Sequence, residues 1–179
     1  MRSMLFCGVA AAALSSAACA DVVLSFTNFT ATGFQFSQFA AAGTLVGNLS
    51  GVSVNATLVA TTAFTYADDL CVYVDVLPLS TLGMVQIGGF SSLGAQQRYF
   101  WPTGASDAIG TAVVGTASFT TACNMSTPNL AIWLGNGYGA AGTSGTWTGT
   151  VTLIGVTLVP APGAIALLGL AGLVGRRRR

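Results

Sequence analysis

The 179-residue chain carries six arginines and five aspartates, and it contains no lysine, glutamate or histidine. Five of the arginines lie in residues 1–20 and 176–179, so residues 21–159 have a formal charge of −4. A body this poor in cations lacks the clustered basic residues that bind phosphates, which excludes nucleic-acid binding. Without histidine or glutamate, a Ser-His-Asp triad, histidine-bound zinc and glutamate acid–base chemistry are unavailable, so we expect a non-enzymatic protein.

The N-terminus has the pattern of a secretion signal. A positive start and an apolar stretch over residues 4–14 precede a small-x-small site that ends at Ala20. We therefore expect a signal peptide of residues 1–20, export by the general secretion machinery, and a mature chain that begins at Asp21. Acylation at Cys19 is the alternative, although the position three residues before it lacks the usual aliphatic side chain.

Residues 21–158 read as one all-β domain. Apolar and polar residues alternate in several segments; Val52, Val54, Ala56 and Leu58, for example, share one face of a strand. The expected strands are 22–27, 33–39, 52–60, 70–76, 84–87, 113–120, 130–134 and 146–158. In the last segment the apolar residues change face, which predicts a bulge or kink near Gly155. No amphipathic helix appears, so the pattern favours a single antiparallel β-sandwich or jelly roll.

Asp68 and Asp69 lie directly before the strand that begins at Leu70. Calcium takes several oxygen ligands, and carboxylates gathered in a loop can supply them, so these two residues are the candidate metal ligands. The alternative is a pair of aspartates that face water at the start of a strand and discourage edge pairing.

An aromatic cluster occupies residues 98–102, and Tyr138 lies among glycines. Flat aromatic rings can stack on sugar rings, so Tyr99, Trp101 and Tyr138 are the candidate glycan-stacking residues, with an exopolysaccharide as partner. The tryptophans in apolar strand patterns are expected in the core instead; they are Trp133 and Trp147.

Cys71 and Cys123 are the two cysteines that remain after removal of the signal peptide. Because an exported protein meets an oxidising compartment, a disulfide between them is expected, and the loop-entropy model would give it about 4 kcal/mol of stabilisation. Two buried, inert thiols are the alternative, since only geometry decides whether the pair can meet.

The C-terminal tail, residues 159–179, combines three elements. Pro160, Ala161 and Pro162 precede an apolar run over residues 163–175, which ends in the stop-transfer cluster Arg176, Arg177, Arg178 and Arg179. A helix of this length spans roughly 20 Å, against roughly 30 Å for a bilayer core. The arginines stay on the cytoplasmic side, so the body is expected outside, with the tail as a short transmembrane helix in the inner membrane.

This tail resembles the PEP-CTERM sorting signal of Gram-negative bacteria, which has a Pro-x-Pro element, a short transmembrane helix and a terminal arginine cluster. Ala161 stands where that family usually has glutamate. The resemblance implies recognition by an exosortase, a membrane-embedded enzyme that removes the tail near the prolines, followed by release to the cell surface or the medium. A permanent single-pass anchor is the alternative.

The body is similar to the P domain that accompanies secreted proteases. The similarity lies in the order of residues 52–60, an acidic dipeptide that opens residues 68–74, and a late Gly-x-Trp strand over 145–153. It implies a jelly roll, with calcium near Asp68 and Asp69. Taken together, the sequence predicts an exported cell-surface or extracellular-matrix protein, with a carbohydrate-binding or adhesin-like module, calcium-dependent or not, as the alternative.

Overall fold

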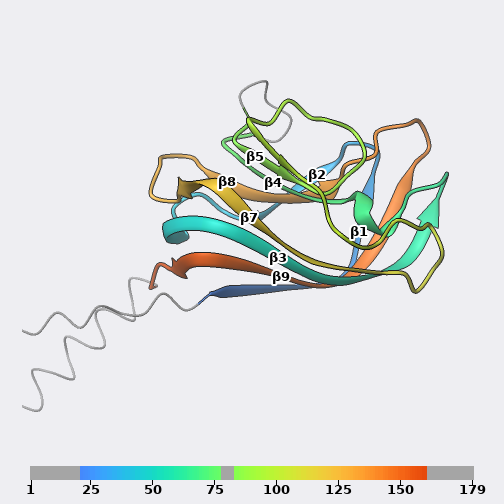
Figure 1. Cartoon of the computed structure of the whole chain (residues 1–179), viewed down its shortest axis with the longest axis horizontal. Helices are drawn as coiled ribbons and strands as arrows, with labels where there is room; N and C mark the ends of the chain where they lie inside the picture. The colour runs from blue at the N-terminus through green and yellow to red at the C-terminus, as the bar shows by residue number, and fades with distance from the viewer. Residues whose placement is uncertain (1–20, 78–82, 161–179) are drawn as a thin grey trace, which may run out of the picture.

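A computed structural model of the protein describes residues 21–77 and 83–160 (Figure 1). These residues form an all-β body of nine strands with one short 3-10 turn, η1 (Ala67–Asp69). Within the described ranges, no helix is long and apolar enough to cross a membrane. Several expected elements lie outside the described residues: the signal peptide up to Ala20, Ala161, Pro162, the helix 163–175, and Arg176 to Arg179.

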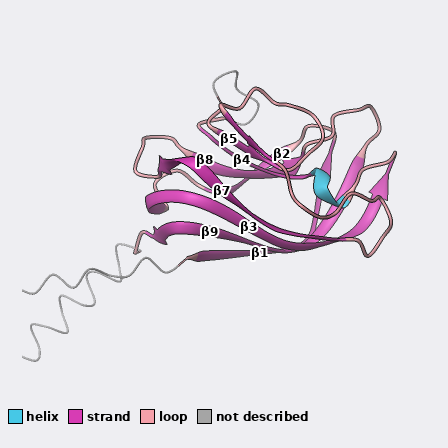
Figure 2. Ribbon diagram, viewed as in Figure 1, coloured by secondary structure: helices cyan, strands magenta, loops and turns pink. Residues whose placement is uncertain are grey.

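The strands form two sheets, which Figure 2 shows one above the other. The four-stranded sheet has the order β1-β9-β3-β7 and consists of β1 (Val22–Thr32), β9 (Ser144–Leu158), β3 (Leu45–Thr62) and β7 (Ala112–Asn124). The five-stranded sheet has the order β2-β8-β4-β5-β6 and consists of β2 (Phe36–Ala40), β8 (Ala131–Asn136), β4 (Leu70–Asp75), β5 (Val85–Ile87) and β6 (Gln97–Tyr99).

The expectation of a wholly antiparallel body needs one correction. The other strand pairs in the two described sheets are antiparallel, but β5 and β6 run parallel, with Val85 opposite Gln97 and Ile87 opposite Tyr99. The connection 88–96 returns the chain to the start of β5, so β6 runs in the same direction. A parallel pair needs such a crossover, whereas a tight hairpin would have reversed the chain.

The apolar face predicted for β3 is confirmed. Its alternating residues Val52, Val54, Ala56 and Leu58 are all buried, while Asn55 on the other face is exposed. They join one core with apolar side chains from both sheets, among them Val72 and Leu153. The two sheets therefore share a single hydrophobic interior, and burial of these side chains is the main term that stabilises the body.

β4 is buried on both faces, which alternation alone does not predict. Leu70, Val72 and Val74 pack in the core. Tyr73, on the opposite face, is also buried, because the β5–β6 connection covers that face and the Tyr73 hydroxyl donates a 3.0 Å hydrogen bond to the carbonyl of Leu93.

The predicted kink in β9 is confirmed at Gly155. Its φ is +86°, and the pairing of β3 with β9 changes register at this point, between Gly47 and Gly51. A residue with a side chain is strained at such a φ, so glycine allows the bulge that re-aims the apolar residues of β9.

The two strand tryptophans have different outcomes. Trp147 is fully buried in the core, as expected, and its indole N–H donates to the carbonyl of Ala67 at 3.0 Å. Trp133 is only half-buried and is not a core residue, because it pairs with Tyr73 on the outer face of the five-stranded sheet. Its indole N–H donates to the carbonyl of Asp75 at 3.1 Å.

The predicted disulfide between Cys71 and Cys123 is wrong, because both cysteines are free and buried. Cys123 lies in the core between the sheets, together with Leu70 and Val72. Cys71 lies between these two residues along β4, so alternation directs its side chain to the other face of the sheet. The sheet thus separates the two thiols. Burial raises the pKa of Cys71 to about 12 and that of Cys123 to about 11, which agrees with the alternative of inert thiols.

Both ends of the described chain lie at one end of the body (Figure 1). There the carboxylate of Asp21 accepts a 3.3 Å hydrogen bond from the N–H of Gly155. β3 starts beside the C-terminal end of β9 and runs to the opposite end of the body, where Thr62 lies opposite Ser144. The β3–β4 connection, which begins after Thr62, therefore lies far from the two chain ends.

Candidate functional site

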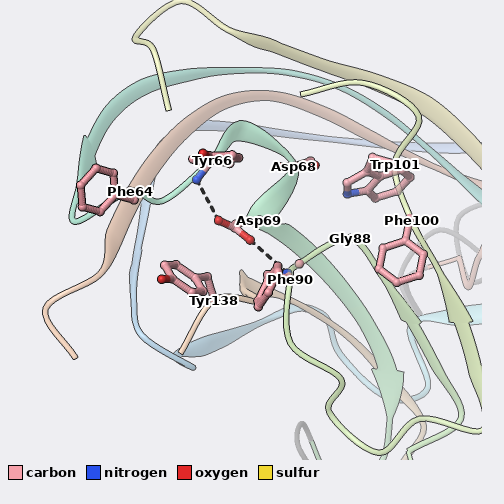
Figure 3. A pocket seen from close by; sticks show the side chains of 10 residues that line it. Phe64, Tyr66, Asp68, Asp69, Gly88, Phe90, Phe100, Trp101 and Tyr138 are labelled. Carbon is pink, nitrogen blue, oxygen red and sulfur yellow. Dashed lines mark hydrogen bonds between the residues drawn. The ribbon is translucent and has the colours of Figure 1, made fainter. Parts of the chain in front are cut away.

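A pocket of about 550 Å³ opens beside the connection that follows β3 (Figure 3). This end of the body lies opposite the chain ends (Figure 1). We call it the aromatic pocket, because six aromatic side chains line it: Phe64, Tyr66, Phe90, Phe100, Trp101 and Tyr138. Asp68, Asp69, Gly88 and Gly89 complete the lining. The residues come from four separate connections, so the fold rather than one motif builds the pocket.

The β3–β4 connection forms one wall. Ala63 and Phe64 both have left-handed backbone conformations, with φ of 51° and 60°, and they turn the chain away from β3. The turn leaves the Phe64 side chain 75% exposed. The 3-10 turn η1 follows, and the Asp69 carboxylate caps it by accepting a 2.8 Å hydrogen bond from the N–H of Tyr66.

Two consecutive glycines lead the chain from β5 into the pocket. Gly88 and Gly89 have φ of +77° and +81°. A Cβ at Gly88 would lie 2.1 Å from the carbonyl oxygen of Leu70, and the N–H of Gly89 donates to the carbonyl of Asp68 at 2.8 Å. Because the backbone approaches η1 this closely, glycine is required at both positions, and Phe90 is carried onto the rim of the pocket.

The carboxylate of Asp69 accepts hydrogen bonds from two of the connections that line the pocket. Its side chain is only 4% exposed, and its second carboxylate oxygen accepts a 3.0 Å bond from the N–H of Phe90. Burial raises its pKa to about 6 and outweighs these hydrogen bonds, which lower the pKa; the neighbouring carboxylate of Asp68 also raises it. Asp68 is half-buried, and burial raises its pKa as well. Both carboxyl groups therefore lie in a weakly hydrated part of the pocket.

Trp101 is part of the pocket wall and does not project from the surface as the sequence predicted. It is 5% exposed, and its indole N–H donates a 2.7 Å hydrogen bond to the carbonyl of Leu70. Its neighbour Phe100 is 67% exposed instead, with the Arg98 guanidinium 4.1 Å above its ring. Arg98 also donates to the carbonyls of Tyr99 and Gly89, so this cation is engaged with the backbone of the pocket.

Tyr99 does not contribute to the pocket, and it shares no exposed patch with Trp101. Its ring stacks on Phe119 of β7 with centroids 5.5 Å apart. Its hydroxyl donates to the Gln97 side chain at 2.9 Å and accepts from the N–H of Thr120 at 2.7 Å. The predicted glycan-stacking residue Tyr99 thus lies outside the aromatic pocket, and these contacts hold its half-buried ring against β7.

Tyr138 does line the pocket, and its ring meets Phe90 edge to face at 5.8 Å. The structure thus brings four of the candidates from the sequence into one site: Asp68, Asp69, Trp101 and Tyr138. Sequence reasoning missed the exposed phenylalanines Phe64 and Phe90. The Gly-Gly pair directly before Phe90 was the available signal, because it forces a turn that can present an aromatic side chain.

The arrangement offers aromatic faces and carboxylates. Calcium takes six to eight oxygen ligands, whereas both oxygens of Asp69 accept backbone hydrogen bonds. Among the described residues, no group of three or more acidic, histidine or cysteine side chains could hold a metal ion. The two aspartates thus fall short of the ligand set that calcium takes, and the chemistry that the lining does supply is ring stacking and attraction of positive charge.

The chain was compared with protein-family models, with curated proteins and with solved structures. None of the three comparisons found a match.

Proposed function

We propose that this chain is an exported, non-enzymatic cell-surface or extracellular-matrix protein with a β-sandwich body of the jelly-roll type. In this proposal the secretion machinery exports it, the tail holds it in the inner membrane, and an exosortase-type enzyme cuts near Pro160, Ala161 and Pro162. The three-part tail supports the sorting step: the element Pro160, Ala161 and Pro162, the apolar run 163–175 and the terminal arginines. The body adds one observation, since both of its described ends lie opposite the aromatic pocket. A body tethered through its tail would turn the pocket away from the membrane.

The intact mass of the extracellular product tests the sorting step. We expect a chain that begins at Asp21 and lacks Arg176 to Arg179. The double variant Pro160→Ala/Pro162→Ala should accumulate in the membrane fraction with the arginines retained. Pro128→Ala, at an exposed position in the body, is the matched control and should be processed normally.

Two results would contradict the proposal. An extracellular product that keeps Arg176 to Arg179 would show release without cutting of the tail. A wild-type chain found only in the membrane with its full C-terminus would support the permanent single-pass anchor instead.

A carbohydrate-binding or adhesin-like module is the second candidate function, and the exposed aromatic rim favours it. Large aromatic rings such as Phe64 and Phe90 are costly to leave in water unless a ligand covers them. A glycan array with the purified exported protein should show binding that Phe90→Ala weakens and Val23→Ala leaves unchanged, since Val23 is exposed at the start of β1, and β1 starts at the end of the body opposite the pocket. Loss of binding on addition of a chelator would support the calcium-dependent form.

A further inference from the structure

Two kinds of side chain line the aromatic pocket, and the charges among them restrict the ligand. Asp68 and Asp69 contribute carboxylates, whereas none of the ten lining residues among those described is basic. Arg98, the one arginine of residues 21–159, donates to two backbone carbonyls and lies over the Phe100 ring. The two carboxylates outnumber this one guanidinium at the edge of the pocket, and the formal charge of residues 21–159 as a whole is −4.

The aromatic rings restrict the ligand in a second way. Phe64, Phe90 and Phe100 come from three different connections, and each leaves most of its ring exposed at the rim. Arg98 covers one face of Phe100, so the open faces are those of Phe64 and Phe90 and the other face of Phe100. Such faces bind either the apolar face of a sugar ring or a cation, which the electrons of the ring attract. A ligand that combines a sugar ring with a positive charge satisfies both features of the pocket.

We propose that the aromatic pocket binds a saccharide unit that carries a free, protonated amino group, with the sugar ring against the aromatic rim and the ammonium group beside Asp68. This inference rests on the carbohydrate-binding function proposed above and names its ligand class. The corresponding polymer is an exopolysaccharide with unacetylated amino sugars.

Other saccharides fit the charges less well. An acidic sugar would be repelled by Asp68 and by the net charge of the body. A neutral sugar would desolvate the carboxylates without giving them a charge partner, which costs free energy. Acetylation of the amine removes the positive charge, so the acetylated and free forms of one sugar differ in the property that the pocket selects.

Binding of two matched oligosaccharides to the purified exported protein tests the proposal by calorimetry. One is a glucosamine oligomer, and the other is the N-acetylglucosamine oligomer of the same length and linkage. At a pH just above about 6, somewhat more than half of the Asp69 carboxyl is ionised, and the free amine still carries its proton. We expect the free-amine oligomer to bind at least about tenfold more tightly, as a charge-assisted contact implies, and to weaken with added salt.

Two variants separate the charge from the ring contacts. Asp68→Asn keeps the shape of the side chain and should reduce the preference for the free amine to about threefold or less, because it removes the charge. Phe90→Ala should weaken both oligomers alike, and Val23→Ala should change neither. Thermal unfolding of each variant verifies that it is folded.

The outcomes distinguish failure of the amino-sugar proposal from failure of the carbohydrate-binding function. Equal or tighter binding of the acetylated oligomer, or an unchanged preference in Asp68→Asn, would overturn the amino-sugar inference and leave the carbohydrate-binding function standing. If neither oligomer nor any saccharide on the array binds, both fail together.

Discussion

The carboxylate of Asp69 accepts a 3.0 Å hydrogen bond from the backbone N–H of Phe90, and this bond joins the turn before β4 to the connection after β5. The other oxygen of the same carboxylate accepts from the N–H of Tyr66. One buried side chain thus fixes the backbone of two rim aromatics, so the charge state of Asp69 affects both the stability of the body and the shape of the pocket.

Stability should fall as the pH rises from about 4 to about 6. The folded-state pKa of Asp69 is about 6, above the ordinary value of 3.8, so in this window the folded state keeps a proton that the unfolded state has lost. The contribution is complete below the unfolded pKa and is lost as the pH passes the folded pKa. Urea denaturation should show a decrease of about 1–3 kcal/mol in the free energy of unfolding.

Asp69→Asn should flatten this part of the pH profile and lower stability at neutral pH by about 1–3 kcal/mol, because an amide has only one oxygen for the two N–H donors. Asp21→Asn, at the exposed N-terminal end, is the control for removal of one charge and should keep the wild-type profile. A wild-type stability that rises from pH 4 to 6 would contradict the argument.

Trp101 and Phe100 are neighbours in the sequence, but we expect only Trp101 to contribute strongly to the stability of the fold. Trp101→Phe removes the indole N–H that the carbonyl of Leu70 accepts in the interior, so we expect a loss of about 1–3 kcal/mol in chemical denaturation. Phe100→Ala removes a ring that is mostly exposed, so its cost should stay below about 1 kcal/mol, including its contact with Arg98. Equal losses in the two variants would show that Trp101 is not the structural partner of β4.

Most of the fold follows from alternation, because one face of each long strand meets the core and the other meets water. This holds for β3, where buried Val54 and exposed Asn55 follow one another. Alternation does not predict that β4 is buried on both faces. The β5–β6 connection covers its outer face, and nothing in the sequence of β4 itself indicates this covering segment. β6, with only three residues, is too short to show a period and was missed.

The candidate site is harder to predict from the sequence than the strands, because it too depends on segments that meet only in the folded chain. Its residues lie in four connections that come together only when the sheets pack, and connections carry no hydrophobic period. The acidic pair could be located because it is unusual in this composition. Its burial could not be predicted, because the covering segment that holds Phe90 lies some 20 positions further along the chain.

The free cysteines lead to a prediction about reactivity. Burial holds the pKa of Cys71 at about 12 and that of Cys123 at about 11, so neither thiol ionises near neutral pH. Iodoacetamide should therefore leave the native exported protein unmodified, and it should alkylate both cysteines after denaturation without a reductant. A peptide that links Cys71 to Cys123 in a non-reduced digest would contradict the separation of the thiols by the sheet.

Gly155 and Gly142 allow the cost of the kink in β9 to be measured. Both have left-handed φ, +86° and +80°, but a Cβ at Gly155 would lie 2.5 Å from the carbonyl oxygen of Asn48, whereas a Cβ at Gly142 meets nothing within 4 Å. Gly142→Ala should cost about 1–2 kcal/mol for backbone conformation alone. Gly155→Ala adds a clash inside the β3–β9 ladder and should cost clearly more, about 3 kcal/mol or above.

Chemical denaturation of the two variants provides this comparison, because the backbone term is common to both and the difference reports the close approach of β3 to β9. A larger loss in Gly155→Ala than in Gly142→Ala is expected, with the aromatic pocket intact in Gly155→Ala, since the bulge lies beside Asp21 at the opposite end of the body. Equal losses would mean that β9 can shift away from Asn48 without cost. In that case the bulge would serve only to re-aim the apolar side chains of the strand, and it would not fix the spacing of β3 and β9.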